Sequence, residues 1–475
     1  MTDDELPWLG AAELGRRIRS GATSSVRATR AYLDRIERLN PRLEAYVTVT
    51  AERALAEAAA ADDEIAQGRW RGPLHGVPYC LKDIVQTAGI RTTAGSYILA
   101  DWVPEADATV LTRLAEAGAV LLGKTNTHEF AFGATTWNLH GRTRNPWDLE
   151  RVAAGSSGGS GSALAAGLAA FSIGSDTAGS IRGPAAYCGI VGLKPTWGLV
   201  SAAGVVAQSF TSDHIGPMAR RVEDLATVMA AIAGPDPADP PCLAEPPPDF
   251  LALGPASLSG LRVGVVPELM QLPLQPGVAA GFEAALAALA RLGARPVEVS
   301  IPLLAEATRI NNAIVPPETM AQHERWQAGW FKGREIRYGD DVAALLAMGA
   351  AVPGTATILA QRDRETLRRQ LAAAFADSVD LLVTPTVAMT ATRPGQSTVD
   401  LGGQTREMLG TMIHFLCGFS LTGVPTLALP SGLAPDGLPV SIQLVGPHRH
   451  DPRVLAVGMA LEAAMDPLPR PGFAA

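Results

Sequence analysis

Apolar residues recur at two spacings in this chain of 475 residues, and the spacings predict two kinds of structure. Near the N-terminus, Val26, Leu33 and Ile36 recur at helical intervals, and the stretch 52–67 is rich in alanine and glutamate. Both features predict helices. Further on, short apolar runs such as 77–85 alternate with glycine-rich turns and helical segments. That alternation predicts an α/β protein with a mostly buried sheet.

Proline becomes frequent in one internal stretch, residues 234–258, which includes Pro246-Pro247-Pro248. Such a composition is typical of a surface loop or linker, so this stretch is the one internal boundary that we expect. We treat the chain as a single domain, 1–475, with four parts: a helical N-terminal segment (1–70), a core that carries the motifs described below (71–233), the proline-rich loop (234–258), and a C-terminal part that completes the sheet and the entrance to the site (259–475).

Composition and charge exclude several classes of protein. Hydrophobic residues make up 47% of the chain and charged residues 18%, which is too apolar for a disordered protein. The net charge is −8 with no basic stripe, so we expect no nucleic-acid partner. The four cysteines are widely spaced and indicate reduced thiols rather than disulfides or a zinc site. We also expect no signal peptide and no membrane span, hence a cytoplasmic protein.

The most informative region runs from Ala153 to Pro195, where two serine-bearing, glycine-rich turns flank an apolar segment. Glycine lets main-chain N–H groups converge without side-chain cover. A hydroxyl beside converging amides is what acyl transfer needs, because it supplies a nucleophile and an oxyanion hole. Turns of this kind are more often plain loops, so the pattern needs support from elsewhere in the chain.

Lys82 offers such support, because it lies inside an apolar, strand-like run. A charged ammonium is costly in that setting, and a buried lysine with a lowered pKa can act as a neutral general base. Alternatively, Lys82 pairs with Asp83 or reaches the surface through its flexible stem.

Together these segments resemble the amidase signature family of Ser-Ser-Lys hydrolases, and the resemblance covers most of the chain. Several further motifs carry it, in the expected order: Gly72-Pro-Leu-His-Gly-Val-Pro78, Gly123-Lys-Thr-Asn126, Arg144-Asn-Pro-Trp-Asp148, Gly192-Leu-Lys-Pro-Thr196, Asp213-His-Ile-Gly-Pro217 and Gly437-Leu-Pro-Val-Ser-Ile-Gln-Leu-Val-Gly446. The resemblance implies one α/β/α layered domain around a large mixed, mostly parallel β-sheet. It implies no metal or organic cofactor.

By motif position, the resemblance gives Ser180 as the nucleophile, Ser156 as a bridging serine held by a cis peptide bond, and Lys82 as the base. Ser156 and Ser180 are 24 positions apart, which agrees with the family's arrangement. The oxyanion hole implied by the resemblance consists of main-chain N–H groups of Thr177, Ala178, Gly179 and Ser180.

The chain departs from the commonest family pattern at two positions, since Ala154 and Ala178 stand where glycine is usual. A Cβ at Ala178 could narrow the oxyanion pocket or require a backbone conformation that alanine disfavours. Other polar residues in the matching segments are expected to stiffen the site rather than to take part in the chemistry. They are Asp176, Arg182, Ser157 and Asp213.

Three aromatic residues lie in the segment that, by resemblance, approaches the acyl pocket: Phe130, Phe132 and Trp137. If they line the cleft, a hydrophobic or aromatic substrate would fit. The main functional expectation is therefore a stand-alone amidase that cleaves small amides, with esters and carbamates (urethanes) as further substrates, and with a homodimer as one form.

The alternative is the glutaminase A subunit of a tRNA-dependent amidotransferase, which shares the family's fold and works with a partner. Against it, the stretch 354–363 lacks the tyrosine-rich pattern expected in that subunit.

Two other patterns suggest different chemistry. Residues 118–125 fit the P-loop motif and would make Lys124 a phosphate ligand, although 119–122 themselves look like a strand. Gly155-Ser-Ser-Gly-Gly159 fits a nucleophile elbow, which would make Ser157 the nucleophile with a downstream histidine. The candidate histidines are His214, His323, His414 and His448, and none lies in a recognisable acid–histidine context.

Overall fold

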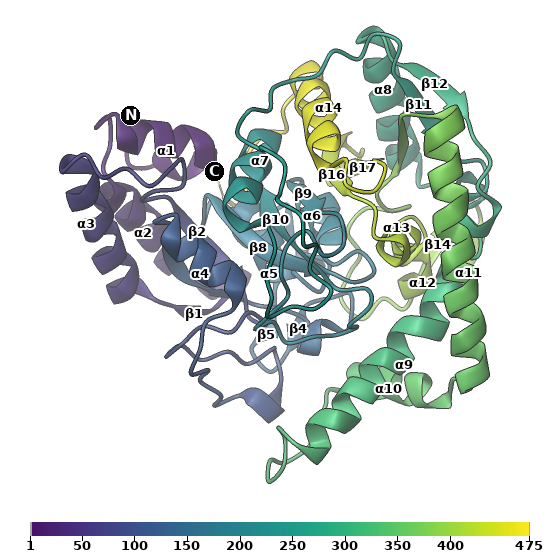
Figure 1. Ribbon diagram of the computed structural model, residues 1–475, viewed down its shortest axis with the longest axis horizontal. Coiled ribbons are helices and arrows are strands. Elements are labelled where there is room, and N and C mark those ends of the chain that lie inside the picture. The colour runs from purple at the N-terminus through teal and green to yellow at the C-terminus, as the bar shows by residue number, and fades with distance from the viewer. Residues whose placement is uncertain (1, 475) are drawn as a thin grey trace.

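A computed structural model describes residues 2–474, and an 11-stranded sheet runs through its centre (Figure 1). In order across the sheet, the strands are β1 (Tyr46–Val49), β3 (Val120–Thr125), β2 (Pro78–Lys82), β8 (Phe171–Asp176), β10 (His214–Ala219), β9 (Val191–Lys194), β16 (Thr426–Leu433), β17 (Pro439–Val445), β13 (Leu381–Pro385), β11 (Arg262–Val265) and β12 (Arg295–Glu298). Six short strands form three hairpins outside it: β4 (Trp137–Asn138) with β5 (Gly141–Arg142), β6 (Arg144–Asn145) with β7 (Asp148–Val152), and β14 (Thr398–Leu401) with β15 (Gln404–Glu407).

The sheet is mixed, which corrects our expectation of a mostly parallel one. Within the described residues, β3–β2, β2–β8, β13–β11 and β11–β12 are parallel, and the other six neighbouring pairs are antiparallel. A strand covered by helices on both faces has a continuous apolar sequence whatever its direction. The apolar runs therefore predicted burial correctly but carried no information on strand direction.

Helices cover both faces of the sheet, and the alternation of side chains along β16 separates the two layers. Leu427 points toward α14 (Asp451–Ala464), where a Cβ built on Gly458 would lie 2.3 Å from its Cδ2. The next residue, Ala428, pairs with Gly192 of β9. A Cβ on Gly192 would lie 2.7 Å from Ile181, the residue before α6 (Arg182–Cys188). The two helices thus lie on opposite faces, as the α/β/α expectation requires.

The remaining helices surround this core: α1 (Ala11–Arg19), α2 (Ser25–Leu43), α3 (Ala51–Ala66), α4 (Thr109–Glu116), α5 (Gly158–Ala165), α7 (Val222–Ile232), α8 (Pro276–Arg291), α9 (Ala307–Ala328), α10 (Asp340–Ala351), α11 (Gly354–Ala373), α12 (Met408–Ile413) and α13 (Cys417–Thr422). The N-terminal helices lie at one end of the molecule, and α9, α10 and α11 form the opposite side (Figure 1). The C-terminal tail returns to the N-terminal end, where Arg35 of α2 donates a hydrogen bond to the carbonyl of Ala474.

The proline-rich stretch 234–258, all of it described, contains no helix or strand. Among residues 2–474, no single helix is long and apolar enough to cross a membrane. Only α10 and the segment Gly354–Ser378 taken together reach that length and composition, and they meet at a bend of 91°.

Candidate active site

Lys82 ends β2, and its side chain is completely buried. Its Nζ lies 2.7 Å from Ser156 Oγ and 2.8 Å from Ser175 Oγ. Burial lowers the pKa of Lys82 from 10.5 to about 7, although the charges of Asp213 and Asp176 act in the opposite direction. A substantial fraction of the amine is therefore neutral near pH 7, as a general base must be.

Ser156 lies in the turn before α5, is fully buried, and follows a cis peptide bond from Gly155. Its carbonyl accepts a hydrogen bond from the N–H of His128 at 3.0 Å. The N–H of Ser157 donates to the carbonyl of Ser180 at 3.3 Å, so the two serine-rich turns are directly linked. Ala154, one of the departures from the family pattern, has φ of +59°.

Ser180 lies in the turn between β8 and α6 and borders a pocket together with Gly155. The turn depends on Gly179, which has φ of +126° and leaves no room for a side chain, because a Cβ there would lie 2.3 Å from Leu416 Cδ1. Ala178 has no positive φ, so its backbone is ordinary for alanine. Ala178 therefore does not adopt the left-handed backbone conformation that would be costly for alanine.

A buried ion pair supports this turn. Asp176 accepts hydrogen bonds from Arg182 Nε and Nη2, each at 3.0 Å, and from the N–H of Gly179 at 2.8 Å. Burial alone would raise the pKa of Asp176, but the charge and hydrogen bonds of Arg182 hold it well below its usual value. Ser420 Oγ also donates to Asp176, and Gln443 Oε1 accepts from Arg182 Nη1. The pair is thus fully hydrogen-bonded, as a buried pair needs to be.

Asp213 holds the same turn from the other side. Its Oδ1 accepts the hydroxyl of Thr177 at 2.6 Å, and its Oδ2 accepts the N–H groups of Gln208 and Ser209 at 2.8 and 3.1 Å. Burial raises the pKa of Asp213 to about 6, against the effect of these hydrogen bonds.

The hydrogen bonds also distinguish among the four main-chain N–H groups that we expected to form the oxyanion hole. The N–H of Gly179 is bound to Asp176, so it is not free for a substrate. The remaining candidates are the N–H groups of Thr177, Ala178 and Ser180.

The pocket at Ser180 is mostly apolar. Among the described residues that line it, the strongly polar side chains besides Ser180 are three carboxamides. They are Gln208, Asn311 and Asn312. Gln208 Oε1 and Asn311 Oδ1 are buried and accept no hydrogen bond from the described residues. The apolar part of the lining includes Phe132, Val315, Leu345, Met412 and Leu416.

Of the three aromatic residues expected near the acyl pocket, only Phe132 lines it. Phe130 is fully buried and packs against His323 with ring centroids 4.6 Å apart. Trp137 is 53% exposed and borders a different hollow with Tyr97. The three aromatic residues lie close together in the sequence. Positive φ values at Phe130 and Ala131 turn the chain there, so the three side chains point in different directions.

Ser175 was missed by the sequence analysis, although it is the second acceptor of the Lys82 amine. It lies on β8, which pairs with β2 in parallel. A serine inside a strand-like run is a weak signal by itself, and only the strand register brings it to Lys82.

The structure excludes the P-loop hypothesis. Residues 120–125 form the buried strand β3 rather than a loop. Lys124 is fully buried, and its Nζ donates to Val85 O and Thr92 Oγ1, both at 2.7 Å, and lies 3.4 Å from Asp83. The amine is therefore used within the core and cannot reach a phosphate.

The nucleophile-elbow hypothesis also lacks its histidine. Ser157 Oγ is buried and donates to the carbonyl of Ser175 at 3.3 Å. One candidate, His214, directs Nδ1 to the carbonyls of Asp176 and Ser212. Among the described residues, no histidine is hydrogen-bonded to Ser157. Nor is any group of three or more His, Cys, Asp or Glu side chains in residues 2–474 arranged to hold a metal ion.

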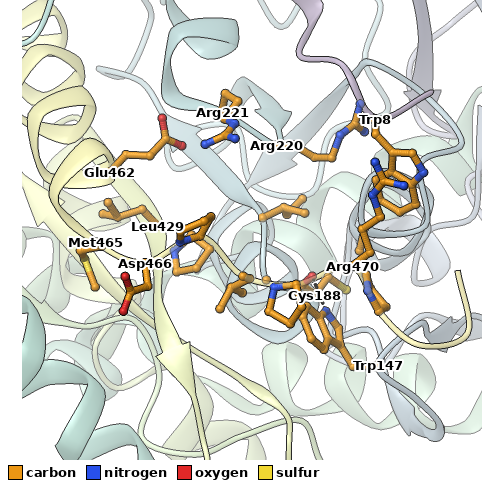
Figure 2. A pocket seen from close by; sticks show the side chains of 18 residues that line it. Trp8, Trp147, Cys188, Arg220, Arg221, Leu429, Glu462, Met465, Asp466 and Arg470 are labelled. Carbon is orange, nitrogen blue, oxygen red and sulfur yellow. Dashed lines mark hydrogen bonds between the residues drawn. The ribbon is translucent and has the colours of Figure 1, made fainter. Parts of the chain in front are cut away.

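Another hollow, of about 290 Å³, lies between the N-terminal segment, the C-terminal tail and α14 (Figure 2). Two of its charged side chains are used within the protein. The Nη atoms of Arg220 donate to four main-chain carbonyls. Glu462, which lies beside Arg221 in Figure 2, accepts the N–H of Val222 at 3.2 Å. None of the residues at Lys82 and Ser180 borders it, so we assign it no part in the chemistry.

Comparison with known proteins agrees with this geometry. The Amidase family model matches residues 27–455. The A subunit of the glutamyl-tRNA(Gln) amidotransferase of Moorella thermoacetica is 41% identical over 484 residues, covering 97% of this chain and 98% of that protein. The same subunit of Thermobifida fusca is 42% identical over 488 residues, with 97% and 96% covered. The structure of the native peptide amidase of Stenotrophomonas maltophilia superposes with a TM-score of 0.83 at 35% identity, and 98% of each chain is covered. The chain belongs to the amidase family.

These relatives correct our main functional expectation. We expected a stand-alone hydrolase of small hydrophobic amides that also cleaves esters and urethanes. The full-length relatives at about 40% identity are not enzymes of that kind. They are amidotransferase A subunits, which was the alternative. The missing tyrosine-rich stretch at 354–363 is one short segment of α11 and does not outweigh similarity over the whole chain.

Proposed function

We propose that this chain is the amide-hydrolysing A subunit of a tRNA-dependent amidotransferase, and that its donor substrate is glutamine. Two observations support the proposal together. One is full-length similarity to such subunits. The other is a buried lysine amine within 2.7 Å of a serine that is linked through the main chain to the Ser180 turn.

In the proposed mechanism, neutral Lys82 Nζ takes the proton of Ser156 Oγ while Ser156 Oγ takes the proton of Ser180 Oγ. Ser180 Oγ forms a bond to the amide carbon, and the N–H groups of Thr177, Ala178 and Ser180 are the candidates to stabilise the negative oxygen. The relay then returns a proton to the leaving nitrogen, the C–N bond breaks, and ammonia departs. Water hydrolyses the acyl-enzyme and releases glutamate by the same route.

The lining of the pocket supports a substrate that carries N–H groups and a short apolar chain. Gln208, Asn311 and Asn312 border the pocket, and carboxamide side chains can both donate and accept hydrogen bonds. Glutamine would place its amide at Ser180, its methylene groups against the apolar lining, and its charged groups toward the mouth of the pocket. This orientation needs no charged side chain in the pocket.

The function also implies partners. An amidotransferase A subunit works beside other subunits and releases ammonia for use on an acylated tRNA. In place of the expected homodimer and the expected lack of a nucleic-acid partner, we therefore propose a protein partner and, through it, tRNA. Cytoplasmic location is part of this proposal, because aminoacyl-tRNA is made and used there.

The test compares the chain alone with the chain purified together with the proteins that bind it in its native cells. We expect ammonia release from L-glutamine by the assembly, little release by the isolated chain, and none by an assembly that carries Ser180→Ala. An assembly that cleaves simple aryl amides but never glutamine would overturn the glutaminase proposal.

A further inference from the structure

A separate pocket of about 740 Å³ lies where the end of α11 meets the loop after β9 and the start of α14. We call it the distal pocket, because its lining shares no residue with the pocket at Ser180. Its lining comes from segments far apart in sequence: Trp197, Leu243, Arg368, Leu371, Ala372, Phe375, Ala376, Asp380, Thr422, Gly423, Val424, Pro447, His448, His450 and Arg453. Its size is that of a site for a small organic molecule.

The body of the distal pocket is apolar and partly aromatic. Trp197, Leu243 and Phe375 are half-buried, and Leu371 is buried. Flat and branched apolar surfaces of this kind bind an aromatic or branched hydrocarbon group. The pocket is therefore suited to an organic molecule with an apolar group rather than to an inorganic ion.

The rim of the distal pocket is cationic. Arg453 is neutralised by Asp380, with Nη2 and Oδ1 3.2 Å apart. Arg368 is different, because its only ion-pair contact among residues 2–474 is to Glu365 at 4.0 Å, and both side chains are substantially exposed. An ion pair of that length and exposure is weak. Arg368 is thus a guanidinium without a close counter-charge at the edge of an apolar pocket, and a guanidinium can bind a carboxylate or phosphate through two hydrogen bonds.

The floor lies over a buried lysine, and burial lowers the pKa of Lys194 to about 7, so much of its amine is neutral near pH 7. Lys194 is fully buried under the pocket, where its Nζ donates to the carbonyl of Val424 at 2.6 Å. Burial lowers the pKa of His448, the charges of Lys194, Arg449 and Arg368 act in the same direction, and Glu245 acts against them. Arg449 is paired with Glu245 at 3.0 Å, so the attraction of the pocket for an anion rests on Arg368.

We propose that the distal pocket binds a small organic anion. Its apolar body would lie against Trp197, Leu371 and Phe375, and its carboxylate or phosphate would be held by Arg368. This inference is independent of the proposed function, because it concerns a different pocket and a different ligand.

The experiment is calorimetric titration of the full chain carrying Ser180→Ala, so that turnover in the other pocket does not interfere. The probes are 2-naphthoate, 2-naphthyl phosphate and the neutral 2-naphthylmethanol, which share one aromatic body. At least one anion should bind one to one and at least tenfold more tightly than the alcohol. A preference for naphthoate would indicate carboxylates as the natural ligands, and a preference for the phosphate would indicate phosphate monoesters.

Two further variants and a matched control locate the binding. Arg368→Gln should weaken anion binding at least tenfold, whereas Arg369→Gln should leave it unchanged, because Arg369 is 77% exposed on the same helix and outside the lining. Ala376→Trp, which fills the pocket from an exposed wall, should weaken binding of the bound anion as well. Equal affinity for the alcohol and the anions, or equal effects of the two arginine variants, would overturn the proposal.

Discussion

The protonation state of Lys82 decides whether Ser180 can attack an amide. A lysine with an ordinary pKa of 10.5 would be charged at pH 7 and could accept no proton, and complete burial is what lowers the pKa to about 7. The two serine hydroxyls around Nζ hold the amine without supplying a counter-charge. Hydrogen bonds to neutral hydroxyls thus keep the amine in place and leave it able to act as a base.

Replacing this amine should remove most of the activity. We expect Lys82→Ala to lower kcat for amide hydrolysis by several orders of magnitude near neutral pH, because no other described group within hydrogen-bond reach of Ser156 Oγ can accept its proton. Steady-state kinetics and circular dichroism together check this. Lys124→Ala, at another buried lysine, is the control: a comparable loss there with the fold intact would argue against a special role for Lys82.

The Asp176–Arg182 pair should be important to stability as well as to activity. Asp176→Asn leaves Arg182 buried with no compensating charge, which typically costs about 3–5 kcal/mol. Asp148→Asn removes a partly exposed ion pair with Arg151 and should cost below about 1 kcal/mol. Denaturant unfolding of both variants measures the difference, and equal losses would show that the buried pair is not what supports the turn.

The positions of individual residues could be predicted where a sequence motif contains them. They could not be predicted where strand register or backbone conformation determines the position of the side chain. The motifs gave Lys82 and Ser156, and the structure brings the two side chains within hydrogen-bond distance. Ser175 escaped because its role depends on strand register. Phe130 and Trp137 were misplaced because positive φ values turn their segment away from the expected course.

The relation between α6 and the sheet fixes the position of Ser180, because the turn that carries Ser180 joins β8 directly to α6. The close approach depends on glycine at position 192 in β9, where any side chain would contact Ile181. Helices and strands could be predicted from periodicity, but the direction of the strands could not. Most neighbouring strands are antiparallel, and strand direction depends on how the strands are connected, which the apolar runs do not indicate.

Gly192→Ala tests this contact. The new Cβ would lie 2.7 Å from Ile181 and 3.1 Å from Ala185, so α6 must move and the Ser180 turn with it. Overpacking of this kind costs about 1–3 kcal/mol, and kcat should fall together with Tm. Gly254→Ala, where nothing lies within 4 Å, is the control and should change neither quantity. Normal kcat in Gly192→Ala would contradict the link between α6 and the site.

The sheet continues across the proline-rich stretch, since β9 precedes residues 234–258, β16 follows them, and the two strands pair. The same buried core cluster contains Leu193 and Leu427 from the two sides. This continuity is why we propose one domain rather than two joined by a linker. The sequence predicted a loop here, and the strand order shows how the parts of the chain on its two sides pair.

Cutting the proline-rich stretch should therefore leave the protein assembled. After limited proteolysis within 234–258, we expect the two fragments to elute together in size-exclusion chromatography and to retain hydrolytic activity. Separation of the fragments under native conditions would show two independent domains and would contradict the single-domain proposal.

The proton relay from Ser180 through Ser156 to Lys82 can be followed by the rate at which a fluorophosphonate labels the protein, with the modified residue identified by mass spectrometry. We predict that the label is on Ser180. Its second-order rate constant should rise with pH through an apparent pKa near 7, as the Lys82 amine loses its proton, and Lys82→Ala should abolish this rise. A label on Ser157, or a rate at Ser180 that is independent of pH between 5 and 9, would contradict the account.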